Sequence, residues 1–107
     1  MEVNQMRYFL DVASTQHVTR SAERLHIAQP ALSKAIHNLE QELGVPLFSA
    51  KGRNIVLTEY GKYLKEKLGG IISEIDELPE EIKAMTDREN ATIHLMVLAA
   101  STLITDA

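Results

Sequence analysis

Residues 19–44 read TRSAERLHIAQPALSKAIHNLEQELG, and this stretch determines how the chain folds. Two amphipathic segments lie here, with only residues 26–28 between them. Thr19 is suited to be the N-cap of the first segment, and Gly44 can adopt the left-handed conformation that ends a helix. The second segment therefore spans residues 29–43. The pattern predicts two helices joined by a tight turn, a helix-turn-helix.

The second of these helices has an apolar side and a polar side. At about 100° per residue, the apolar side consists of Leu32, Ile36, Leu39 and Leu43. The polar side presents short or hydrogen-bonding groups over its first turns, which is typical of a helix that enters the DNA major groove. The candidate DNA contacts are Thr19 and Arg20 on the first helix and Gln29, Pro30, Ala31, Ser33, Lys34 and His37 on the second. An ordinary helical hairpin with a solvated polar side is the alternative.

The composition of the 107-residue chain suits one small domain with an appendage, and its hydrophobic share of 45% allows a real core. The sequence contains no cysteine, which excludes disulfides and thiolate zinc sites. We expect a cytoplasmic location, because no leader pattern and no stretch of membrane-spanning length is present.

The net charge of −4 is unevenly distributed. Residues 1–68 carry nine Lys or Arg against seven Asp or Glu, a net charge of +2. Residues 69–107 carry two against eight, a net charge of −6. The basic residues therefore lie with the helix-turn-helix, but phosphate contacts must come from a few placed side chains rather than from a general positive field.

The segments on either side of residues 19–44 complete a small head. Residues 3–14 place apolar side chains at helical spacing, and Phe9 is predicted to be the hub beneath the helix-turn-helix. After residue 44, VPLFSAKGRNIVLT predicts a β-hairpin whose residues 49–54 carry Lys51 and Arg53. A helix-turn-helix followed by such a hairpin is a winged helix, whose wing lies along the DNA backbone or places an arginine in the minor groove. A solvated loop is the alternative.

A long helix is expected from Thr58, its N-cap, onward. Its apolar positions alternate by four and three and are Leu64, Leu68, Ile71, Ile75, Leu78, Ile82 and Met85. The small head cannot cover so long a heptad seam, which predicts pairing with the same helix of a second subunit. Gly69, Gly70 and Pro79 weaken the helix, so we expect it to reach at least residue 78, with a bend or a second segment to about residue 88.

The last segment, TIHLMVLAASTLITDA, contains a nearly continuous apolar run at residues 93–100. Such a run is expected for a strand buried on both faces of a parallel sheet. A lone strand would be an aggregation hazard. We therefore interpret Thr92 as the beginning of an α/β domain of which this chain holds only the first strand, with Ser101 capping the helix that would follow.

The motifs FLDVAS, SAERLHIAQPALSKAIHNLEQELGVPLF and GRNIVLTEYG, followed by a long helix and an apolar run, resemble the N-terminal region of LysR-type transcriptional regulators. The resemblance extends from residue 3 to about residue 100. It implies a bacterial repressor or activator that binds double-stranded DNA as a homodimer, with a tetramer in the full-length protein. It also implies a small-molecule coinducer, bound by a C-terminal domain that is mostly missing here, and neither a cofactor nor a membrane.

The resemblance can be carried over position by position. The recognition-helix contacts of the family fall at Gln29, Pro30, Ser33 and Lys34, and the wing of the family contains the position of Arg53. Two residues depart from the family pattern: Ala50 replaces a usual basic residue, and His17 stands where serine is common. Ser101 and Thr102 match the first strand-to-helix turn of the effector domain, where the family often holds its ligand.

The expected architecture is therefore mainly α. It comprises a winged helix-turn-helix head at residues 1–58, a linker and dimerisation helix at residues 59–88, and the truncated start of an effector domain at residues 92–107. An enzyme is disfavoured, because the four histidines lack ligand spacing and no phosphate loop or nucleophile elbow is present. A protein-interaction module with a coiled coil is the other alternative, and the matched set of Gln29, Ser33, Lys34 and Arg53 argues against it.

Overall fold

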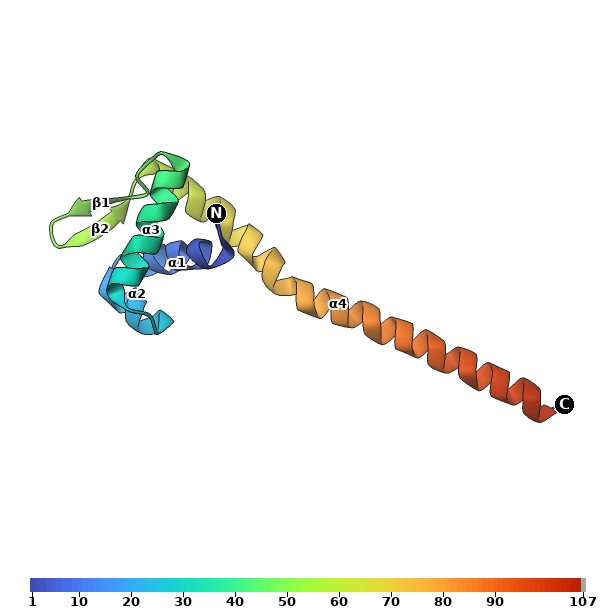
Figure 1. Cartoon of the computed structure of the whole chain (residues 1–107). Helices are drawn as coiled ribbons and strands as arrows, with labels where there is room; N and C mark the ends of the chain where they lie inside the picture. Colours follow the sequence, from blue (N-terminus) through green and yellow to red (C-terminus); the bar gives the residue numbers. More distant parts are fainter. Residues whose placement is uncertain (107) are drawn as a thin grey trace. The chain divides into compact units, whose positions relative to one another are not determined.

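The computed structural model describes the backbone of residues 1–106 and the side chains of residues 1–102. Five elements form the head: α1 (Val3–Thr15), α2 (Val18–Leu25), α3 (Gln29–Leu43), β1 (Phe48–Lys51) and β2 (Asn54–Leu57). Helix α4 (Glu59–Asp106) follows and contributes its first turns to the head (Figure 1). The chain divides into two units, residues 1–72 and the residues from Ser73 onward.

Two apolar clusters hold the head together. The first joins the central turns of α1 to α3, to the root of the hairpin and to α4, and consists of Phe9, Ala13, Leu39, Leu47 and Leu68. The second lies between α1, α2 and α3 and consists of Val12, Ala22, Leu32 and Ile36. Phe48 packs against both clusters, with its ring 5.5 Å from that of Phe9. Phe9 is fully buried, as expected of a hub.

The helix-turn-helix matches the prediction except at the N-cap of α2 and at Leu43, whose exposure is described below. Helix α3 spans the expected residues, and Gly44 ends it with a φ of +75°. His26 also adopts a left-handed conformation, and Ile27 packs into the second cluster. Thr19, however, is not the N-cap of α2. Backbone Arg20 N–H donates to Nδ1 of His17 at 3.2 Å, so the cap lies two residues earlier and the helix begins at Val18.

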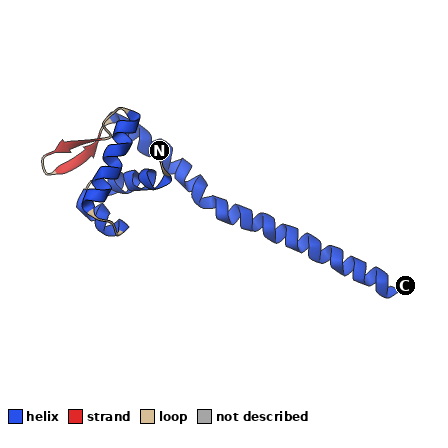
Figure 2. Ribbon diagram, in the orientation of Figure 1, coloured by secondary structure: helices blue, strands red, loops and turns tan. Residues whose placement is uncertain are grey.

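The hairpin is tighter than the sequence suggested. Strands β1 and β2 form an antiparallel hairpin (Figure 2). The pairing runs from Phe48↔Leu57 to Lys51↔Asn54, which leaves only Gly52 and Arg53 in the turn. Gly52 has a φ of +62°, which glycine adopts without steric cost. Lys51 is therefore the last residue of β1 rather than part of a loose tip.

The heptad positions of α4 divide into two groups. Leu68 is only 3% exposed and belongs to the core of the head, and Leu64 packs against the same cluster, so these two residues do not belong to a free seam. Ile72, which is off the predicted seam, is also buried. The head covers this part of α4 because α1 and α3 lie against it, which a single-helix pattern does not reveal. Leu43, expected in the core, is 38% exposed because it lies in the last turn of α3.

One expectation for the C-terminal half of the chain is confirmed in part, and another was wrong. Helix α4 reaches beyond residue 78, as expected, but it continues as one helix through Pro79 and past residue 88. The loss of one backbone hydrogen bond at proline is tolerated here because most flanking residues are good helix formers. Residues 92–102 are helical rather than a strand, and Ser101 and Thr102 lie inside α4 instead of at a strand-to-helix turn. A strand without a neighbour leaves its backbone groups unpaired, whereas a helix pairs them within the segment.

Candidate nucleic-acid interface

The polar side of α3 carries the predicted contacts of the second helix. Gln29, Lys34 and His37 are exposed, as are Pro30 and Ala31, and Ser33 is half-buried. Nε2 of Gln29 donates to Oγ of Ser33 at 3.2 Å, one helical turn away. This hydrogen bond restrains the Gln29 carboxamide and leaves its oxygen and its second N–H for a partner.

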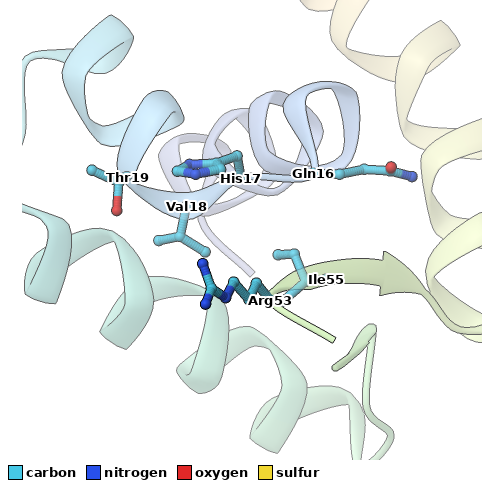
Figure 3. Close-up of a pocket in the computed structure, with 6 residues that line it drawn as sticks. All are labelled: Gln16, His17, Val18, Thr19, Arg53 and Ile55. Carbon is cyan, nitrogen blue, oxygen red and sulfur yellow. The ribbon is translucent and has the colours of Figure 1, made fainter. Parts of the chain in front are cut away.

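A hollow of about 210 Å³ joins the start of α2 to the wing. Its lining comprises Gln16, His17, Val18, Thr19, Arg53 and Ile55. Figure 3 shows the Arg53 side chain reaching from the hairpin to a position beside Val18, with the His17 ring on the other side of Val18. The structure therefore brings Arg53 and Thr19 together, although the sequence indicated them as separate contacts.

The cationic groups on these elements are available to an anionic partner. Within the described part of the chain, no ion pair joins Arg20, Lys34, Lys51 or Arg53 to a carboxylate. By contrast, Arg24 pairs with Asp11 at 3.5 Å. Cations that lack an internal partner can exchange counterions for phosphates.

Sequence reasoning missed three sets of contacts that build this surface. His17 is the N-cap of α2, the role that was expected of Thr19. Oε2 of Glu40, on α3, accepts hydrogen bonds from backbone N–H groups at the root of the wing. The Thr58 hydroxyl donates to Pro46 O at 2.6 Å and accepts from Gly61 N–H at 3.1 Å, which ties the start of α4 to the same root. The Thr58 cap was expected, but its bond to Pro46 was not.

The described residues provide neither a metal site nor a membrane-spanning helix. No group of three or more His, Cys, Asp or Glu side chains is placed to hold a metal ion. No helix there is both long and apolar enough to cross a membrane.

Residues 3–62 match the family model of bacterial regulatory helix-turn-helix proteins of the lysR family. The chain belongs to this family. Members of the LysR family are transcriptional regulators that bind DNA, and not enzymes. The predicted family, mainly α fold and class of function are thus confirmed.

Relatives and solved structures agree with this assignment. The chain is 41% identical over 108 residues to the uncharacterized HTH-type transcriptional regulator YybE of Bacillus subtilis, covering 99% of this chain and 37% of that protein. It is 35% identical to IlvR of Caulobacter vibrioides, covering 94% of this chain and 34% of that regulator. The chain therefore spans about a third of the length of these LysR-type relatives.

Two of the similar structures are DNA complexes. The DNA-binding domain of BenM, solved with catB site 1 DNA, has a TM-score of 0.77 and 35% identity, covering 80% of this chain and 96% of that chain. The DNA-binding domain of CbnR, also solved with DNA, has a TM-score of 0.76 and 31% identity, covering 80% of this chain and 99% of that chain.

Proposed function

We propose that the head, residues 1–58, binds double-stranded DNA with α3 in the major groove and with wing residues 49–54 on the backbone or in the minor groove. The observation that supports this proposal is the arrangement of cations. Lys34 on α3 and Arg53 in the wing are both exposed, and neither has an internal carboxylate partner among the described residues. DNA complexes of similar LysR-type heads support it as well.

The side chains of the interface divide into base-reading and phosphate-binding groups. Gln29 reads a base edge, because its carboxamide, restrained by Ser33, retains the donor and acceptor pair that matches adenine N7 and N6. Arg53 enters the narrow minor groove or binds the phosphates beside it. The remaining phosphate and backbone contacts come from Thr19, Arg20, Lys34 and Lys51, with Pro30, Ala31 and His37 lining the groove.

We infer that the chain forms a homodimer through α4. After Leu68, most seam positions are open: Ile71 is 47% exposed and Met85 is 61% exposed, whereas Ile75 is half-buried. The free part of the seam consists of Ile71, Ile75, Leu78, Ile82 and Met85. An exposed apolar stripe of this spacing is stabilised by a partner helix.

The charges of α4 favour antiparallel pairing. Residues 62–67 carry three lysines and one glutamate, whereas residues 74–81 carry five acidic residues and no basic one. Parallel helices would place the acidic segments side by side, and like charges repel. Antiparallel helices that cross near residue 71 would place each acidic segment beside the basic segment of its partner. Two heads on such a dimer read two half-sites.

The wider roles follow from the longer relatives. We propose that the region from Thr92 onward leads into a C-terminal effector domain that binds a small-molecule coinducer, and that the full-length protein is a tetramer working in the cytoplasm. Residues 93, 95, 96, 97 and 98 are large, apolar and 50–66% exposed, which suits a segment that such a domain would cover.

Selection from a random library of DNA duplexes tests this function. The protein is expected to enrich one sequence that contains two related half-sites, and footprinting should show their centres separated by a multiple of about one helical turn. A protein that enriches no sequence, or that binds every duplex equally, would contradict sequence-specific regulation. Variants of Gln29 should change the preferred sequence, because direct readout resides in base-edge contacts.

A further inference from the structure

Glu40 stands out as an acidic side chain close to a surface that binds a polyanion. It lies on α3, between the buried residues Ile36 and Leu39 and the exposed C-terminal turn. Its Oε2 accepts a hydrogen bond of 2.7 Å from Leu47 N–H and a longer one of 3.4 Å from Phe48 N–H. The carboxylate therefore joins the recognition helix directly to the root of the wing.

Side-chain packing alone leaves room for the wing to move against α3. A hollow of about 170 Å³ lies between the two elements, and Ser33, Ile36, Glu40, Phe48 and Ile55 are among its lining residues. Phe48 and Ile55 pack against the cluster that contains Ile36 of α3, so packing holds one side of the wing, while the side that borders the hollow is less strongly held. The direction of the wing then depends more on hydrogen bonds at its root.

The other hydrogen bonds of this root lead away from α3. Leu47 C=O accepts from Thr58 N–H at 3.0 Å, and Pro46 C=O accepts from the Thr58 hydroxyl. These bonds connect the wing to the start of α4. The Glu40 carboxylate instead connects it to the helix that enters the major groove.

We propose that Glu40 is a positioning residue for DNA binding. Its carboxylate holds the root of the wing against α3, so that Arg53 and the α3 side chains meet the same DNA duplex together. This inference rests on the proposed function, because it assumes that Arg53 contacts DNA. Simple electrostatics predicts that the loss of a negative charge near a DNA-binding surface strengthens binding. Removal of the Glu40 carboxylate should instead weaken it.

A double-mutant cycle on the whole chain tests the proposal. Glu40→Ala leaves two backbone donors without their acceptor and should lower the affinity for the selected duplex by about tenfold. Arg53→Ala should lower it by about tenfold in the wild-type background and by less than twofold in the Glu40→Ala background. Glu40→Gln keeps one oxygen acceptor and should restore part of the affinity.

Glu42→Gln provides the matched control. It removes the same charge two residues further along α3, where the carboxylate contacts the amino group of Met1 rather than the wing. Its affinity for DNA should equal or slightly exceed that of the wild type. Equal effects of Arg53→Ala in both Glu40 backgrounds, with all variants folded by circular dichroism, would overturn the positioning role.

Hydrogen exchange without DNA gives a second, independent readout. In Glu40→Ala, the amides of Leu47 and Phe48 should exchange at least about tenfold faster, while the amide of Phe9 in α1 keeps its rate. If Glu40→Ala does not fold, the same comparison is made with Glu40→Gln, with a smaller acceleration expected. Unchanged exchange at Leu47 in the variant would refute the proposal by itself. A wild-type protein that binds no DNA would refute the proposed function and with it the role of Glu40 in DNA binding, but not the anchoring of the wing root that exchange measures.

Discussion

The substitution Gly61→Ala tests the junction at which the wing root meets α4. A Cβ atom built on Gly61 would lie 2.2 Å from Leu47 O and 2.8 Å from Cδ2 of Leu57, whereas ordinary van der Waals contact begins near 3.4 Å. The closest atom belongs to the backbone, and that carbonyl already accepts the N–H of Thr58. The added methyl group can therefore be accommodated only by moving α4 away from the wing root.

Two opposing effects set the magnitude. Alanine is favoured over glycine in a helix by about 1 kcal/mol. Overpacking of a well-packed site typically costs about 1–3 kcal/mol and occasionally more, and a contact this short against backbone belongs at the upper end of that range. We expect the free energy of unfolding to fall by about 2 kcal/mol or more, which corresponds to roughly 8–16 °C in the melting temperature of a head of this size.

Gly69→Ala and Gly70→Ala are the matched controls on the same helix. Nothing lies within 4 Å of a Cβ atom at either position, and neither position is on the heptad seam. Each control should be stabilised by about 1 kcal/mol through helix propensity alone. The assay is urea unfolding followed by far-ultraviolet circular dichroism, at one protein concentration because dimerisation adds to stability. A Gly61→Ala protein as stable as these controls would refute the packing of α4 against Leu47.

Three further predictions concern the cap, the dimer and the DNA contacts. His17→Ala should destabilise the head by about 1 kcal/mol and His17→Ser should restore most of that loss, since serine also caps helices; equal melting temperatures would contradict the cap. The chain has no cysteine, so a single introduced cysteine reports on the pairing of α4. Antiparallel helices that cross near residue 71 bring the two copies of that residue together, so under oxidation Ile71→Cys should form a disulfide-linked dimer and Met85→Cys should not. Parallel helices would be linked at both positions. Arg53→Ala should reduce the salt dependence of DNA binding, whereas Gln29→Ala should leave it unchanged and alter the preferred sequence; the reverse pattern would exchange their roles.

The head could be predicted from sequence because its signals are local. The spacing of Leu32, Ile36 and Leu39 marks the buried side of α3, and Gly44 marks its end. Helical periodicity and capping act within a few residues, so one sequence suffices to reveal them. The exposed polar side of α3 followed from the same periodicity.

Long-range contacts were less accessible to sequence reasoning. The hydrogen bond that Leu47 N–H donates to Glu40 and the burial of Leu68 and Ile72 depend on how separate elements meet. A heptad count assigned Leu68 to a partner helix, although the head of the same chain covers it. The hollow shared by Arg53 and Thr19 also depends on the direction of the wing, which no local pattern encodes.

The segment from residue 93 to residue 100 shows how context decides between helix and strand. Its apolar run is compatible with a buried strand, but the described residues of this chain contain only the two strands of the wing as a sheet. The backbone of the segment is therefore paired within α4. Periodicity alone does not distinguish the two structures in a short apolar run.

The salt dependence of DNA binding by the wild-type chain tests the central claim most directly. Each head offers four cations to phosphates: Arg20, Lys34, Lys51 and Arg53. A dimer therefore makes about eight phosphate contacts. For that number, the logarithm of the association constant should fall with the logarithm of the salt concentration with a slope of about −7. The affinity for the selected duplex should then drop by about 10⁴-fold between 50 and 200 mM salt. A slope near zero, or an affinity no greater for the selected duplex than for a scrambled one, would contradict sequence-specific binding by paired winged heads.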